Sequence, residues 1–185
     1  MRLRIRRHDL AGSGPVTVLP VENGAATFPI GRWEALLESP AGYYVSGVSG
    51  SAFTTNRLRP DGWQEISSPP SGAYGGVRFA LSPGASAVHG MLKGSDSPVS
   101  GVPVYLEAYD SSARKRVAEL RTAISDLHGR YRFDGLAPGT YRILGTFEYL
   151  SPSPETIDAA DADAPALTLD AHSDVTRDLD LCAIR

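Results

Sequence analysis

The sequence predicts an all-β protein made of two tandem antiparallel β-sandwiches. Apolar and polar residues alternate with a period of two in several short runs, as expected for strands with one buried and one wet face. The 185 residues include 19 glycines and 14 prolines, which favours many turns and few helices. Hydrophobic residues make up 42% of the chain, so enough apolar surface is present to form a core.

The clearest alternation lies in the stretch 129–143. The side chains expected on its buried face are Tyr131, Phe133, Tyr141 and Ile143. A connection with Gly135, Pro138 and Gly139 separates the two runs, because glycine can take positive φ and proline fixes its own φ for a turn. Leu136 is the lone large apolar residue of this connection and is expected to close one end of the core. The stretch therefore predicts a strand, a corner and a second strand.

At these residues the chain resembles a known family. The pattern T-x-x-x-D-x-x-G-R-Y-x-F-x-G-L-x-P-G-x-Y-x-I, from Thr122 to Ile143, and the run from Pro98 to Leu106 are similar to segments of the carboxypeptidase regulatory-like domain. The resemblance covers about residues 86–185, roughly the ~100 residues of such a sandwich. It implies a transthyretin-like, carbohydrate-binding-like fold of the Ig-like or prealbumin-like kind, and a piece of a longer exported bacterial protein. It leaves the function open, because this fold hosts spacers, binding modules and enzyme appendages.

The first half is predicted to be a weaker, divergent copy of the same sandwich over residues 1–83. Alternation predicts strands near 2–6, 15–21, 26–30, 32–37, 43–48 and 74–81. An Asn23-Gly24 hairpin turn is expected, since this pair suits the turn with positive φ at both positions. Trp33 is expected in the place that Tyr141 has in the other copy. The stretch 51–71 is polar and broken by prolines, so no strand is predicted there.

The second half begins after Ser82-Pro83-Gly84, the predicted domain boundary, which gives domains 1–83 and 84–185. Strands are expected near 87–92, 102–109, 117–124, 130–134, 139–150 and 175–183. Ser153-Pro154 is typical of a helix start and predicts one short helix near 154–160. In the last strand, Leu179 and Leu181 are expected to face inward.

Charge and cysteine content narrow the classes of partner. The formal net charge of -3 gives no reason to expect nucleic acid or an anionic membrane surface. Cys182 is the single cysteine, so no internal disulfide is expected. The residues after Met1 lack the apolar core of a signal peptide, and no stretch approaches the ~20 apolar residues of a membrane span. An extracellular, periplasmic or cell-envelope location is expected from the resemblance.

No catalytic, cofactor or metal constellation stands out, so a non-enzyme is expected. Ser112-Ala113-Arg114-Lys115 matches S-x-x-K only formally, because it lies in a charged hairpin loop and not at a helix start. The histidines are not at metal-ligand spacing; they are His8, His89, His128 and His172. The acidic run from Asp158 to Asp170 lacks the alternating turn of a calcium-binding loop.

Aromatic residues are the remaining indication of a ligand. Sugar-binding sandwiches stack exposed rings on pyranose faces, and the candidates here are Trp63, Tyr43, Tyr74, Tyr105 and Tyr109. Period two places Tyr105 and Tyr109 together on the outer face of one strand. The alternative is that most of these rings are core residues or cross-strand packing pairs.

Two functions remain open from the sequence. The first is a non-catalytic structural or interaction module that spaces or docks other domains of a parent protein, or other surface proteins. The second is a carbohydrate-binding module of similar fold, with a polysaccharide as its partner. Neither function requires a cofactor.

Overall fold

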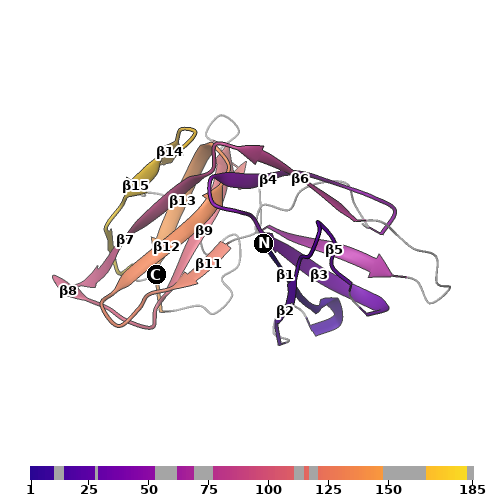
Figure 1. Ribbon diagram of the computed structural model, residues 1–185. Coiled ribbons are helices and arrows are strands. Elements are labelled where there is room, and N and C mark those ends of the chain that lie inside the picture. The colour runs from indigo at the N-terminus through magenta and orange to yellow at the C-terminus, as the bar shows by residue number, and fades with distance from the viewer. Residues whose placement is uncertain are drawn as a thin grey trace. The chain divides into compact units, whose positions relative to one another are not determined.

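A computed structural model describes residues 1–10, 15–27, 29–52, 62–68, 77–110, 115–116, 121–147 and 166–182. Within these ranges the regular structure is β-strands and the 3-10 helix η1 (His8–Leu10), which confirms the all-β fold class. The chain divides into two compact units, unit 1 (Met1–Pro83) and unit 2 (Gly84–Arg185), shown in Figure 1. The helix predicted near 154–160 lies outside the described residues.

Unit 1 packs a four-stranded antiparallel sheet against a two-stranded one. The larger sheet has the order β2-β1-β3-β5, and the smaller sheet joins β4 to β6. The strand bounds are β1 (Arg2–Arg7), β2 (Thr17–Pro20), β3 (Gly31–Glu38), β4 (Tyr43–Ser49), β5 (Trp63–Ser68) and β6 (Arg78–Pro83). Its buried core consists of Leu3, Ile5, Ala35, Val48, Ala52 and Ile66. Because these residues come from both sheets, unit 1 is a small sandwich.

The local sequence explains the strand faces and a turn of unit 1. Leu3 and Ile5 on β1 are buried, while the arginines that alternate with them are more exposed, as period two predicts. Asn23 and Gly24 have φ angles of 51° and 77°, so both central residues of the turn take the left-handed conformation. Hydrogen bonds of 2.9 Å in both directions between the backbones of residues 22 and 25 close this turn, which confirms the predicted hairpin.

Two predictions for unit 1 are wrong. Residues 26, 27, 29 and 30 form no strand, and β3 begins only at Gly31. Strand β5 crosses the polar stretch in which no strand was predicted, because Gln64 and Ile66 point inward and are buried. Alternation was not visible there because one of the two inward positions holds a glutamine in place of an apolar residue.

Unit 2 packs two five-stranded sheets against each other. In one sheet β9 is central, with β13 and then β14 on one edge and β10 and β11 on the other. In the other sheet β7 is central, with β12 and β15 as its neighbours, and β8 and β16 also pair with it. The bounds are β7 (Ser86–Gly94), β8 (Ser97–Pro98), β9 (Pro103–Asp110), β10 (Lys115–Arg116), β11 (Arg121–Ile124), β12 (Arg130–Leu136), β13 (Gly139–Gly145), β14 (Leu167–Leu169), β15 (Asp174–Thr176) and β16 (Leu179–Asp180).

The core of unit 2 contains the side chains predicted from the stretch 129–143. Its buried residues are Val88, Leu92, Val102, Val104, Leu106, Tyr131, Phe133, Leu136, Tyr141, Ile143 and Leu169. Gly135 has a φ of 65°, and the β12–β7 register shifts between Phe133 and Leu136, which brings Leu136 into the core. Gly129 has a φ of 73°, and a Cβ there would lie 2.8 Å from the carbonyl oxygen of Leu92. Only glycine fits that turn.

The end of the chain departs from the antiparallel scheme. β15 and β16 run parallel to β7, and they replace the single strand predicted over 175–183. The break falls at Arg177, whose carbonyl oxygen would lie 1.9 Å from a Cβ at Gly90. The chain can approach β7 so closely there because Gly90 has no side chain. Leu179 and Leu181 pack against the core, as predicted, while residue 183 lies outside the described residues.

Candidate functional site

The outer face of the four-stranded sheet of unit 1 carries a cluster of charged residues around Trp63. Strand register brings Arg6, Glu34 and Glu65 into one row across β1, β3 and β5. On the next row of the same face, Leu36 is paired with Trp63. The cluster arises because polar residues occupy the outward positions of three adjacent strands.

Arg6 is the centre of this cluster. Its Nε donates to Glu34 Oε2 at 2.5 Å, and its guanidinium carbon lies 4.1 Å from the centroid of the Trp63 ring. A cation in that position is attracted by the ring, so one face of the indole is already occupied. Glu34 is only 6% exposed, which means that its charge is held by nearby donors and not by bulk water.

A histidine and a second ion pair extend the cluster. His8 Nδ1 lies 4.0 Å from Glu34 Oε1, and His8 Nε2 lies 3.7 Å from Glu65 Oε1. Arg32 Nη2 donates to Glu65 Oε1 at 2.5 Å. The carboxylates therefore bind the neighbouring arginines, and the arrangement holds the sheet together across β1, β3 and β5.

Three other aromatic candidates, Tyr43, Tyr105 and Tyr109, lie in the described part of the chain. Tyr105 is 2% exposed, so the prediction that it offers a ring on an open outer face is wrong. β9 is buried on both faces from Val104 to Glu107, and this burial raises the pKa of the Tyr105 hydroxyl. Tyr109 lies under the Arg142 guanidinium, whose carbon is 4.0 Å from the ring centroid. Tyr43 on β4 is 44% exposed, and Tyr74 lies outside the described residues.

A second polar cluster, on the outer face of the β12-β7-β15 sheet, was not predicted. His89 Nδ1 lies 2.8 Å from Asp174 Oδ1, and His89 Nε2 lies 3.1 Å from Thr176 Oγ1. Arg132 reaches the same aspartate, with Nη2 3.2 Å from Asp174 Oδ2, and it also donates through Nε to Asp134 at 2.8 Å. These contacts link three neighbouring strands at an exposed surface.

Hydrogen bonds lower the pKa of three carboxylates of unit 2, those of Asp126, Asp174 and Asp178. The hydrogen bond from His89, followed by that from Arg132, lowers the pKa of Asp174. For Asp178 the lowering of the pKa comes first from Lys93 and then from the backbone N–H of Met91. The pKa of Asp126 is lowered chiefly by the hydrogen bond that it accepts from the backbone N–H of Arg130. The same hydrogen bond holds the turn before β12 in place. Sequence spacing gave no sign of these partners, because most of them are distant in the chain.

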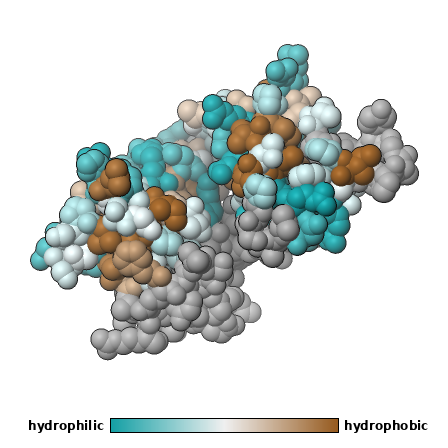
Figure 2. Space-filling view, turned by 90° about the horizontal axis from the view of Figure 1, so that it is seen from below, coloured by the Kyte–Doolittle hydropathy of each residue, from teal (hydrophilic) through white to brown (hydrophobic). Residues whose placement is uncertain are grey.

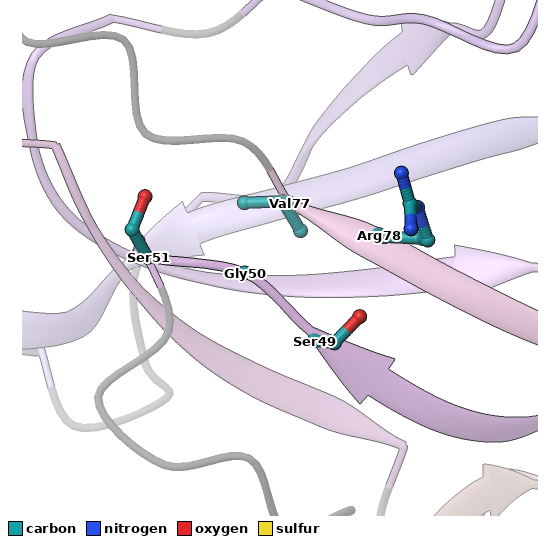
Figure 3. A pocket seen from close by; sticks show the side chains of 5 residues that line it. All are labelled: Ser49, Gly50, Ser51, Val77 and Arg78. Carbon is teal, nitrogen blue, oxygen red and sulfur yellow. The ribbon is translucent and has the colours of Figure 1, made fainter.

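Unit 1 also contains two hollows that share Val77 and Arg78. One has a volume of about 300 Å³ and lies where β4 ends and β6 begins, lined by Ser49, Gly50, Ser51, Val77 and Arg78 (Figure 3). Two hydroxyls and a guanidinium supply hydrogen-bond donors. The described lining has no carboxylate, imidazole or thiol that could take up a proton.

The second hollow is an apolar cleft of about 410 Å³ between the two sheets of unit 1. Its lining residues are Met1, Leu3, Val21, Gly24, Ala25, Ala26, Leu37, Ile66, Val77, Arg78, Phe79 and Leu81. It borders β6 but no residue of β4, so it opens on the side of β6 that faces away from β4. The small sheet thus leaves part of the core of unit 1 uncovered.

Hydrophobic residues also reach the surface elsewhere. On the face seen in Figure 2, they form separate groups with hydrophilic residues between them. The large hydrophobic residues that are exposed in the described ranges are Met1, Val16, Val18, Ile30, Tyr43, Ile124, Leu127 and Phe147. Scattered exposed residues of this kind are normal on a folded domain.

In the described part of the chain, no group of three or more His, Cys, Asp or Glu side chains is arranged to hold a metal ion. No helix there is long and apolar enough to span a bilayer. Of the S-x-x-K sequence, residues 112–114 lie outside the described residues, as do residues 158–165 of the acidic run.

Comparison with known proteins gives only distant likenesses. No protein-family model matches the chain, and no curated protein matches it. Among solved structures, the chain is similar to a streptococcal ancillary pilin, with 14% identity and a TM-score of 0.40 over 100% of this chain and 62% of that one. It is similar to the TIE protein of Bacillus anthracis, with 9% identity and a TM-score of 0.36 over 98% of this chain and 31% of that one.

A third solved structure is similar to part of the chain. It is a candidate carbohydrate-binding protein from Pseudomonas aeruginosa, with 16% identity and a TM-score of 0.34 over 52% of this chain and 88% of that one. The chain spans less than two thirds of the length of the pilin and of the TIE protein. At these TM-scores the likenesses carry no conclusion about function.

Proposed function

We propose that this chain is a non-catalytic structural and interaction module of a bacterial secreted or cell-envelope protein. Unit 2 would be a carboxypeptidase regulatory-like sandwich that joins or spaces other parts of that protein. One observation carries the proposal: the residues that make the resemblance are the ones that hold unit 2 together. The rings of Tyr131, Phe133 and Tyr141 are buried in the core, and positive φ is found at Gly129 in the turn before β12 and at Gly135 in the register shift of β12.

The polar side chains of unit 2 support the same interpretation. The Ser125 hydroxyl accepts a hydrogen bond from the backbone N–H of Val102 and donates one to the carbonyl of Val99. These two bonds hold the segment before β9 in place. Asp126 caps the turn before β12 by accepting from the backbone N–H groups of His128 and Arg130. Asp126, which belongs to the family pattern, and its neighbour Ser125 are thus engaged in building a scaffold.

The location can be tested in the organism that makes the protein. Antibodies raised against the purified chain should label intact cells, or should detect the chain in the culture medium. Labelling that appears only after lysis would contradict the secreted or cell-envelope proposal. A cytoplasmic marker protein, probed in the same samples, is the control for cell breakage.

Carbohydrate binding is the second candidate, and the exposed ring of Tyr43 is the observation that favours it. Retention on insoluble polysaccharides and on a glycan array should be measured for the wild type and for the Tyr43→Ala and Trp63→Ala variants. Tyr44→Ala, a half-buried neighbour on β4, is a matched control. A structural module predicts no retention. Retention that is lost in Tyr43→Ala or Trp63→Ala but kept in Tyr44→Ala would establish the sugar-binding function instead.

A further inference from the structure

The first and last strands of unit 2 lie side by side. β7 begins the unit, and Figure 1 shows β15 beside it. Both β15 and β16 pair with β7 in parallel, from Ala87 with Asp174 to Lys93 with Asp180. We call this contact the terminal seam; it comprises residues 86–94 on one side and 173–181 on the other. Because the strands are parallel, the chain enters the seam at one end through β7 and leaves it at the opposite end through β16.

Backbone hydrogen bonds follow the terminal seam along its length. Ala87 N donates to Ser173 O at 2.8 Å near the start of the seam. Arg177 N donates to His89 O at 2.7 Å in the middle, and Leu181 N donates to Lys93 O at 2.6 Å near the end. Since parallel ladders have evenly spaced bonds, a pull along the strands is shared among them.

Side chains reinforce the point at which the ladder is interrupted. Asp178 accepts from the backbone N–H of Met91 through Oδ1 and from Lys93 Nζ through Oδ2, each at 3.0 Å. The Tyr131 hydroxyl reaches from β12, on the other side of β7, and donates to the carbonyl of Arg177. The break between β15 and β16 is therefore bridged twice. Asp178 binds β7 directly, and Tyr131 reaches Arg177 from β12 on the far edge of β7.

The start of the terminal seam has its own side-chain links. His89 on β7 contacts Asp174 and Thr176 on β15, and Asp174 also binds Arg132 on β12. Together with Asp178, these contacts connect β7 to the last strands at successive positions. The polar cluster found on this face thus lies along the terminal seam.

Tension on the two ends of unit 2 loads the terminal seam in shear. β7 is pulled backward and β16 forward, so the strands must slide along each other and many bonds are stretched at the same time. When a hairpin is pulled from its open end, by contrast, its bonds break one after another. Shear therefore raises the free-energy barrier to unfolding under force. The force at which a domain opens depends on its unfolding rate and not on its equilibrium stability.

We propose that unit 2 is a load-bearing element that carries tension along the chain, with the terminal seam as its mechanical clamp. This inference rests on the proposed structural function and names the work that the module does. Unit 1 has no equivalent contact among its described residues, since β1 pairs with β2 and β3 while β6 pairs with β4. Unit 1 is thus an internal reference in the same molecule.

Single-molecule force spectroscopy on the full chain tests the clamp. With handles at the two chain ends, two unfolding steps are expected, and the step at higher force should release the longer contour length. That step belongs to unit 2, which runs from Gly84 to Arg185, while unit 1 runs from Met1 to Pro83. A longer step that occurs at the lower force would overturn the proposal.

A change of pulling direction is the sharpest control, because it leaves the protein unaltered apart from the attachment point. Leu127 is 89% exposed in the turn before β12, and β12 starts opposite Met91, near the end of β7 and β16. A handle at position 127, used with the handle at the C-terminus, peels β16 from its end. Unit 2 should then open at a several-fold lower force. Equal forces in the two directions would refute a clamp at the terminal seam.

Substitutions locate the clamp. Asp178→Ala removes two hydrogen bonds of the terminal seam and should shorten the lifetime of unit 2 under constant force by about tenfold. The matched control is Asp134→Ala, which removes an exposed carboxylate that binds Arg132 but does not touch the seam, and it should leave the lifetime unchanged. Equal lifetimes for the two variants would overturn the assignment. Surface labelling remains a separate readout, so failure of the clamp is distinguishable from failure of the proposed function.

Discussion

Units 1 and 2 use their aromatic residues in different ways. In unit 2 the rings of Tyr131, Phe133 and Tyr141 fill the space between two five-stranded sheets. In unit 1 the buried core is aliphatic, and both indole rings lie near arginines: Arg6 over Trp63, and Arg7 with its guanidinium carbon 5.2 Å from the centroid of Trp33. Period-two alternation assigns a ring to a face of a sheet. Whether that face becomes a core depends on the sheet that covers it.

The covering sheet explains the second difference between the units. Among the described residues of unit 1, the β4–β6 pair covers the four-stranded sheet, and a cleft of about 410 Å³ remains between the two sheets. Unit 2 has two sheets of equal size, and its first and last strands are joined. We therefore expect unit 2 to be the more stable of the two.

Gly90→Ala should have the largest effect. The new Cβ would lie 1.9 Å from the Arg177 carbonyl oxygen, so the last strands must move away from β7. A loss of about 4 kcal/mol or more is expected, which can unfold a domain of this size. Urea denaturation followed by circular dichroism measures it. Gly47→Ala, where a Cβ would lie 3.6 Å from the Ala80 Cβ, is the control and should cost less than about 1 kcal/mol.

Phe133→Ala and Phe79→Ala compare the two cores directly. Phe133 is fully packed, so its removal leaves a closed cavity and should cost about 3–5 kcal/mol. Phe79 is half-buried beside an open cleft, so mainly transfer free energy is lost, about 1–2 kcal/mol. Chemical denaturation of the two variants checks this. Equal losses would mean that the cleft of unit 1 is filled in solution.

Acid should weaken unit 2 through Asp178. Its pKa is lowered by Lys93 and by the Met91 backbone N–H, with Arg177 and the Tyr131 hydroxyl also nearby. A depressed pKa stabilises the fold above the ordinary value of 3.8, and that contribution disappears as the pH falls through the folded-state value. Denaturation midpoints measured between neutral pH and pH 3 should fall less steeply below pH 4 for Asp178→Asn than for the wild type. Parallel curves would contradict this linkage.

Arg132→Ala should have the smallest effect. Arg132 alternates with the buried residues of β12, and its side chain is 47% exposed, so its ion pairs with Asp134 and Asp174 are screened by water. A cost of at most about 1 kcal/mol is expected, slightly above the value for a surface side chain without partners. A loss as large as that of Phe133→Ala in the same denaturation assay would reverse the face assignment of β12.

Much of the fold was predictable wherever local signals agree with the final packing. The stretch 129–143 combines alternation with glycines at sharp turns, and the Asn23-Gly24 pair specifies its own turn. β5 was missed because an inward Gln64 hides its period. The parallel pairing of β15 and β16 was missed because alternation does not reveal which distant strand a segment will join.

The candidate site was less predictable than the fold. Tyr105 lies on the expected face of β9 but is buried, since a strand pattern identifies a face without identifying what covers it. The cluster of His89, Asp174 and Thr176 joins residues 85 and 87 positions apart, so no local spacing could indicate it. Trp63 was chosen as a candidate by residue type alone. The arginine that covers its ring is Arg6 on β1, which is distant from Trp63 in the sequence, so no local pattern indicated the contact.

The parallel terminal seam also sets the order in which the protein can be completed during synthesis. Ala87 can pair with Asp174 only after that residue has been synthesised, so this edge of β7 stays open until residues 174–180 have left the ribosome. Pairing over so long a separation is slow, because the loop must close before any contact rewards it. Unit 1 ends at Pro83 and does not need these late residues, so it can fold while unit 2 is still incomplete.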